Sequence, residues 1–205
     1  MTTRTLAVVA AGLSTPSSTR LLADRLVAAT VQALAERGVE AQVHVVELRE
    51  HARDLADALV TGFPGPGLAA AQEAVTGADG LIAVTPVFSG SYSGLFKTFF
   101  DVLDKDSLTG RPVLMGATAG TARHSLVLEH AMRPLFSYLR TLVVPTAVFA
   151  APEDWGVGEG SGAPLSARVE RAAAELADLV AGRRASAPAD PLLGSPSAQE
   201  LLGLA

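Results

Sequence analysis

The residues best suited to bind a ligand lie just after the first apolar run of the chain. Arg4 to Ala11 are almost continuously apolar, and the stretch GLSTPSST follows them. Its side-chain hydroxyls come from Ser14, Thr15, Ser17, Ser18 and Thr19. Arg20 stands in the first turn of an expected helix, where free backbone amides and the helix dipole favour an anion. The stretch predicts a site for a single phosphate, although helix capping by Ser17 or Ser18 would explain the same residues.

A second stretch of interest, PVFSGSYSG, begins at Pro86 after the apolar run DGLIAVT. It carries few groups that could exchange a proton, but many backbone amides and carbonyls beside the aromatic ring of Phe88. Backbone donors and acceptors next to an aromatic ring suit a flat heterocycle with polar edge atoms. An ordinary strand-to-helix turn with aromatic residues in the core is the alternative interpretation.

A third stretch of small residues, from Thr118 to Thr121, follows the apolar run PVLMGAT. Small residues let the backbone approach a ligand closely, although simple turn geometry would also explain them. All three stretches follow expected strands of a parallel sheet, so we expect them to meet at the carboxyl edge of that sheet, where ligands bind.

The usual groupings of catalytic side chains are missing from the sequence. There is no cysteine, no G-x-S-x-G after a strand, and neither a P-loop nor a G-x-G-x-x-G motif. His124 and His130 are six residues apart, which is not a metal-ligand spacing. We therefore expect no metal site and no catalytic side chain. Ligand-binding stretches without such groups are typical of an enzyme whose cofactor carries out the chemistry.

The elements that position these stretches alternate along the chain. Apolar runs predict five strands, at Arg4–Ala11, Glu40–Leu48, Leu81–Thr85, residues 112–118 and residues 143–151. Helical spacing predicts helices between them, including residues 94–104, 125–142 and 165–183, and two short helices separated by FPGPG. This alternation predicts an α/β protein with a five-stranded parallel sheet covered on both faces, for which the flavodoxin-like order 2-1-3-4-5 is a common arrangement.

Composition narrows the class of protein. Of 205 residues, 49% are hydrophobic and 18% charged, which is typical of a globular chain long enough for one core. The net charge of −5 disfavours nucleic acid as a partner, and no apolar run is long enough for a membrane span. We expect a soluble cytoplasmic protein with one domain at residues 1–184. The tail at residues 185–205 is rich in Pro, Ala and Ser, and we expect it to be mobile or ordered only against a neighbouring subunit.

The stretch TPVFSGSYSGLFKTFFDVLD, from Thr85 to Asp104, resembles the signature PxYxxSxSGxLKxxxDxL of the NADPH-dependent FMN reductase family. The resemblance continues through LTGRPVLMGATAGTARH and EHAMRPLFSYLR, and extends from Leu6 to Phe149. In that continuation the chain is similar to FMN reductases of two-component monooxygenase systems, such as the alkanesulfonate reductases. The resemblance implies a flavodoxin-like fold, FMN as cofactor or substrate, NADPH or NADH as hydride donor, and a homodimer or homotetramer.

The resemblance also assigns residues to FMN. It implies that the phosphate is held by Ser14, Ser17, Ser18, Thr19 and Arg20. It implies that the isoalloxazine is lined by Pro86, Val87, Phe88, Ser89 and Gly90, and that its other edge is flanked by Thr118, Ala119, Gly120 and Thr121. The nicotinamide would then lie on the exposed flavin face and pass a hydride to the ring.

Two departures from the family accompany these assignments. Phe88 stands where the family often has Tyr, so a hydroxyl contact is lost there. Some two-component reductases carry an extra Tyr that distorts the helix after the third stretch and stacks at the tetramer interface. The aligned residue here is His130, and Pro134 follows four residues later. We hypothesise a π-bulge between Leu126 and Pro134.

The sequence thus favours an NAD(P)H-dependent FMN reductase that releases reduced FMN to a partner monooxygenase. One alternative is a quinone or azo-compound reductase that retains FMN. A non-enzymatic electron carrier like flavodoxin is another, although the chain lacks the strongly acidic face that such carriers often use for docking. A binding domain that has kept the fold without flavin is the fourth interpretation.

Overall fold

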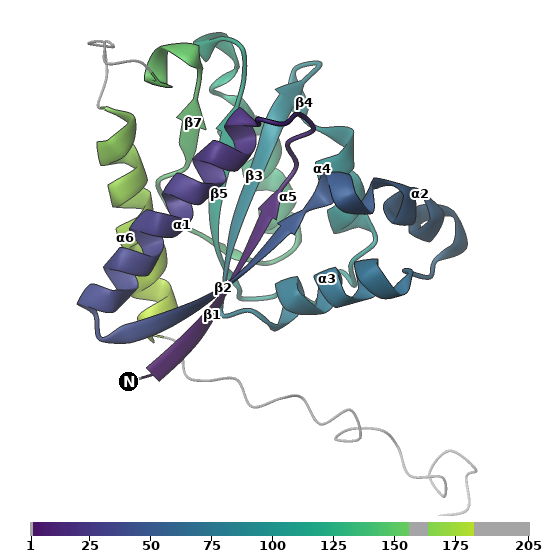
Figure 1. The fold of residues 1–205 in the computed structure, drawn as a ribbon, viewed down its shortest axis with the longest axis horizontal. Helices are drawn as coiled ribbons and strands as arrows, with labels where there is room; N and C mark the ends of the chain where they lie inside the picture. The colour runs from purple at the N-terminus through teal and green to yellow at the C-terminus, as the bar shows by residue number, and fades with distance from the viewer. Residues whose placement is uncertain (1, 156–163, 183–205) are drawn as a thin grey trace, which may run out of the picture.

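The computed structural model describes residues 2–155 and 164–182 (Figure 1). The expected tail at residues 185–205 lies outside the described residues, as does the glycine-rich segment 156–163. Within the described residues, no helix is both long enough and apolar enough to cross a bilayer.

A single twisted sheet organises the fold. Its strands are β1 (Thr2–Ala10), β2 (Val39–Glu47), β3 (Gly80–Phe88), β4 (Ser91–Tyr92), β5 (Pro112–Thr118), β6 (Leu142–Val143) and β7 (Val148–Ala150). The order is β2-β1-β3-β5-β6. Strand β7 also pairs with β5, at residues later in β5 than those that pair with β6. All these pairings are parallel. If β6 and β7 are counted as one interrupted strand, this is the predicted flavodoxin-like order, which is confirmed.

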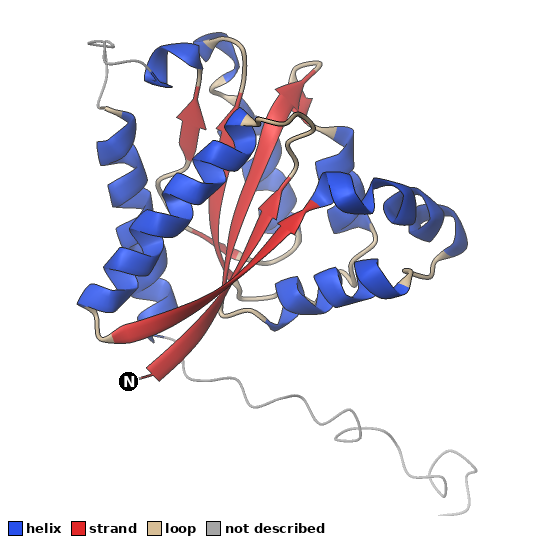
Figure 2. Cartoon of the chain, viewed as in Figure 1, coloured by secondary structure: helices blue, strands red, loops and turns tan. Residues whose placement is uncertain are grey.

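Helices cover both faces of the sheet, as predicted (Figure 2). One face carries α1 (Ser18–Glu36) and α6 (Leu165–Gly182), which pack over the alternate β1 residues Leu6, Val8 and Ala10. The other face carries α2 (Ala52–Thr61), α3 (Pro66–Gly77), α4 (Gly94–Asp101) and α5 (Arg133–Tyr138). Residues 6–10 of β1, 80–86 of β3 and 112–118 of β5 are buried on both faces, and these parts of the strands are mainly apolar.

The third strand is longer than predicted. It does not end at Thr85 but continues to Phe88, turns at Ser89 and Gly90, and pairs antiparallel with β4. Ser89 and Gly90 both have positive φ, 49° and 82°, as the two central residues of a type I′ hairpin turn require. The predicted end of the third strand at Thr85 is therefore wrong, because residues 86–92 form a hairpin.

The fifth predicted strand is divided into β6 and β7. Pro145 has no N–H to contribute to the sheet. The next residue, Thr146, gives its backbone N–H and its hydroxyl to the Glu175 carboxylate on α6, both at 2.7 Å. Because the N–H of Thr146 is bonded to Glu175, it does not bond to a neighbouring strand. The sheet is therefore interrupted between the two short strands.

The helix predicted for residues 125–142 is also interrupted, and the π-bulge expected within residues 126–134 is confirmed. Leu128–Met132 form a π-helix, and the N–H of Arg133 donates to the carbonyl of Leu128, five residues back. Pro134 lies in the first turn of α5, where its missing N–H costs no helical hydrogen bond. The long apolar pattern thus forms a π-helix followed by a short α-helix.

Candidate functional site

The three predicted stretches meet in one cleft of about 330 Å³ at the carboxyl ends of β1, β3 and β5. The residues that line it are Leu13, Ser14, Ser17, Ser18, Thr19, Pro86, Val87, Phe88, Thr118, Ala119 and Gly120. Four residues that the resemblance assigned to FMN, Arg20, Ser89, Gly90 and Thr121, are neighbours of the lining residues but do not line the cleft.

Residues 12–19, here called the phosphate loop, close tightly onto the start of α1. Ser17 is the N-cap of this helix, and its Oγ accepts the N–H of Arg20 at 3.2 Å. A Cβ on Gly12 would lie 2.1 Å from that same Oγ, so any other residue at position 12 would require the capping side chain or the loop to shift. The first amides of a helix have no intrahelical acceptor, so an anion at this end of α1 is favoured. Ser17 therefore caps the helix and also lines the cleft.

A hydroxyl pair at the cleft connects the phosphate loop to the end of β5. The Oγ1 atoms of Thr19 and Thr118 are 2.8 Å apart, and the two residues are only 2% and 3% exposed. Both are lining residues, so this hydrogen bond fixes the first and third predicted stretches relative to one another.

The β3–β4 hairpin supplies the second wall of the cleft. Its base is fixed by the buried hydroxyl of Thr85, which donates to the carbonyl of Pro86 at 2.9 Å and accepts the N–H of Ser93 at 3.0 Å. Phe88 on the hairpin and Leu13 on the phosphate loop are both lining residues, and they are 46% and 55% exposed. Exposed apolar side chains from two segments that line one cleft suit the faces and edges of a flat ring.

The charge of Arg20 is balanced by two carboxylates. Its Nε donates to Asp24 at 2.8 Å and its Nη1 to Glu47. The hydrogen bond to Asp24, assisted by the charges of Asp24 and Glu47, raises the pKa of Arg20 against the opposing effect of burial. The sequence prediction placed Arg20 beside a phosphate site, but it included neither Glu47 nor Arg49, the second arginine that pairs with Glu47.

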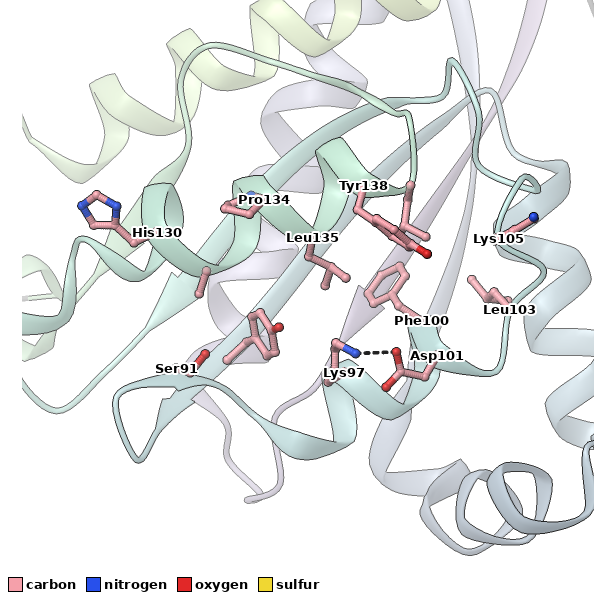
Figure 3. A pocket seen from close by; sticks show the side chains of 13 residues that line it. Ser91, Lys97, Phe100, Asp101, Leu103, Lys105, His130, Pro134, Leu135 and Tyr138 are labelled. Atoms are coloured by element: carbon pink, nitrogen blue, oxygen red, sulfur yellow. Dashed lines mark hydrogen bonds and ion pairs between the residues drawn. The ribbon is translucent and has the colours of Figure 1, made fainter.

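A second and larger cavity, of about 620 Å³, lies between α4 and the π-helix (Figure 3). Its lining is Ser91, Tyr92, Lys97, Phe100, Asp101, Leu103, Lys105, His130, Ala131, Pro134, Leu135, Tyr138 and Leu139. An ion pair between Lys97 and Asp101, four residues apart on α4, lies along it, and Phe96 and Phe99 of the same helix are fully buried in the core. No residue assigned to FMN lines this cavity, which is called the groove below. No cluster of metal-ligating side chains occurs within residues 2–155 or 164–182.

The donor set of the cleft fits a ligand that has a phosphate at one end and a flat ring at the other. Hydroxyls and helix amides lie at the phosphate loop, apolar side chains at the hairpin, and small residues at the end of β5. Together with the strand order, this places the chain among the flavodoxin-like α/β proteins.

The family follows from comparison with known proteins. Residues 4–156 match the sequence pattern of the NADPH-dependent FMN reductases, and the chain belongs to that family. It is 37% identical over 175 residues to an FMN reductase (NADPH) of Pseudomonas aeruginosa, covering 85% of this chain and 91% of that protein. It is 40% identical over 136 residues to the NADH-dependent FMN reductase SfnF of Pseudomonas fluorescens, covering 66% of this chain and 73% of that one.

Solved structures agree with this assignment. An oxidoreductase from Corynebacterium diphtheriae superposes with a TM-score of 0.85 at 50% identity, covering 90% of this chain and all of that one. An NADH:FMN oxidoreductase in its apo form superposes with a TM-score of 0.71 at 25% identity, covering 85% and 88% of the two chains.

Proposed function

We propose that the protein is an NAD(P)H-dependent FMN reductase, which transfers a hydride from the nicotinamide to the flavin. The observation that carries this proposal is the single cleft formed by the phosphate loop, the hairpin and the end of β5. Among residues 2–155 and 164–182, its lining contains hydroxyls, small residues and apolar side chains but no carboxylate, histidine or lysine. Such a lining binds and orients, and FMN supplies the redox chemistry when bound.

The proposed roles follow the walls of the cleft. Ser14, Ser17, Ser18 and Thr19, with the first amides of α1, would hold the phosphate, and Arg20 would add positive charge from the adjoining turn. Pro86, Val87 and Phe88 would line the ring, with Ser89 and Gly90 forming the turn behind them. Thr118, Ala119, Gly120 and Thr121 would flank the other edge. Phe88, with no hydroxyl, offers the ring only apolar contact.

We further propose that reduced FMN leaves the protein for a flavin-dependent monooxygenase, and that residues 1–184 act as one domain within a homodimer or homotetramer. The cleft has no charged side chain among the lining residues that the structure describes, which supports exchange of the flavin. The π-helix at Leu128–Met132 supports the likeness to two-component reductases, some of which have a distorted helix at the tetramer interface.

Oxidation of NADPH and of NADH by the purified protein, followed aerobically with and without added FMN, tests the activity. We expect FMN-dependent oxidation of at least one nicotinamide, and no oxidation with any acceptor would refute the proposal. Stopped-flow measurement of flavin dissociation between turnovers then tests release. FMN that stays bound while a quinone or azo dye is reduced would contradict the transfer of free reduced FMN.

A further inference from the structure

A charged network at the carboxyl end of β2 holds the phosphate loop from outside the cleft. Glu47 is the last residue of β2 and pairs in register with Ala10, the last residue of β1. Arg49 follows in the short 3-10 helix Leu48–His51. The register of two neighbouring strands therefore brings this pair beside the loop that leaves β1.

Arg49 contacts two consecutive residues of the phosphate loop. Its Nη1 donates to the hydroxyl of Thr15 and, at 3.4 Å, to the carbonyl of Ser14. Its Nε pairs at 2.9 Å with one carboxylate oxygen of Glu47, whose other oxygen accepts from Arg20. One carboxylate thus holds two arginines: Arg49, which contacts Ser14 and Thr15, and Arg20, which follows the last residue of the loop.

The position of Arg49 suits a supporting role and not direct contact with a ligand. Ser14 lines the cleft, whereas Arg49, Glu47 and Thr15 do not. The side chains of Arg49 and Glu47 are 30% and 19% exposed, so the network is partly shielded from solvent. Residues 11–17 form no strand or helix and so lack the regular backbone hydrogen bonds of those elements. The side-chain contacts of Arg49 therefore help to restrain this segment.

We propose that Arg49, oriented by Glu47, is a positioning residue for the FMN phosphate, because it fixes Ser14 and Thr15 in the shape that receives the phosphate. This inference rests on the proposed function. The role needs two different nitrogens of one guanidinium, Nε for Glu47 and Nη1 for the loop. A lysine has the charge but only one nitrogen, and it cannot hold both partners in this fixed geometry.

Affinities for FMN and for riboflavin, measured by quenching of flavin fluorescence, test the proposal, because only FMN carries the phosphate. In Arg49→Ala we expect the preference for FMN over riboflavin to fall by about tenfold, as for loss of a hydrogen bond to a charged group. Arg49→Lys should lose most of the same preference. Thr15→Val should lose part of it, and Arg49→Ala combined with Thr15→Val should lose less than the sum. Arg53→Ala, an exposed arginine on α2, is the matched control and should leave the preference unchanged.

Three outcomes would overturn the proposal. An unchanged preference in Arg49→Ala would show that the network does not act on the phosphate. Full retention of the preference in Arg49→Lys would show that charge alone matters. Equal losses for both flavins with a lowered melting temperature would show a merely structural role. A wild-type protein that binds neither flavin would instead refute the proposed function itself, so the two failures are distinguishable.

Discussion

The hydroxyls of Thr19 and Thr118 are 2.8 Å apart, although 99 residues separate them along the chain. One lies in the first turn of α1 and the other is the last residue of β5. Both are buried, so each hydroxyl has exchanged its hydrogen bonds with water for this one. The cleft is thus closed at this point by a polar contact between two distant segments.

Thr118→Val should destabilise the protein, because it leaves the hydroxyl of Thr19 buried without this partner. A lost partner of this kind costs about 1–3 kcal/mol of unfolding free energy. The double variant Thr19→Val with Thr118→Val removes both polar groups and should be more stable than the sum of the single changes. Urea denaturation of the four proteins measures the coupling, and strictly additive losses would contradict it.

Gly12→Ala should weaken FMN binding, because its new Cβ would lie 2.1 Å from Ser17 Oγ and force the phosphate loop to move. Overpacking of this kind lowers the free energy of unfolding by about 1–3 kcal/mol. Gly77→Ala is the matched control, since no heavy atom lies within 4 Å of its added Cβ. Titration with FMN checks the expectation, and wild-type affinity in Gly12→Ala would show that the loop is not part of the site.

Arg20→Ala should weaken the affinity for FMN more than that for riboflavin, by roughly tenfold if one charge-assisted hydrogen bond to the phosphate is lost. The two carboxylates that hold Arg20 lower this effect, because the phosphate competes with Asp24 and Glu47 for the same guanidinium. Paired titrations with the two flavins measure the difference, with the exposed Arg171→Ala as a control. Equal losses for both flavins would limit Arg20 to a structural role.

The Glu129–Arg133 pair should make the π-helix region sensitive to acid. Arg133 donates two hydrogen bonds to the carboxylate, at 2.5 and 2.9 Å. That hydrogen bonding, aided by the charges of Arg133 and His130, lowers the pKa of Glu129, while burial opposes the shift. A pKa lower in the folded than in the unfolded state means that the carboxylate stabilises the protein above the unfolded pKa, and that this stabilisation is lost as the pH falls through the folded pKa.

Glu129→Gln should therefore lower the melting temperature slightly at neutral pH, and the difference from the wild type should vanish in strong acid. Thermal unfolding of both proteins across this pH range measures it, and the comparison cancels the titration of all other carboxylates. The effect should be small because the pair is partly exposed to solvent. A difference that is constant with pH would show that the ionised carboxylate does not stabilise the fold.

The order of the sheet could be predicted because apolar runs and helical segments alternate throughout the chain. The bounds of β5, Pro112–Thr118, agree with the prediction because Gly110 and Pro112 mark its start. The hairpin was missed because its turn carries Ser89 and Gly90 within a run of small residues, and such runs are equally typical of open loops. The SG dipeptide between VF and SY was the available signal.

Most residues of the cleft could be predicted because each stretch lies at or just after the carboxyl end of its strand. Glu47 and Arg49 could not be, because their contact with the phosphate loop depends on the register between β1 and β2 and not on any local motif. The pairing of Arg20 with Asp24, four residues away on one helix, was within reach of local rules, whereas its bond to Glu47 was not.

The β3–β4 hairpin is a partition between two cavities. Val87 and Phe88 line the cleft, while their cross-strand partners Tyr92 and Ser91 line the groove beside the π-helix. A molecule bound in the groove would therefore contact the same hairpin that forms a wall of the cleft. If the hairpin moves on binding, binding in the groove and binding in the cleft are thermodynamically coupled. Each ligand then changes the affinity for the other by the same factor.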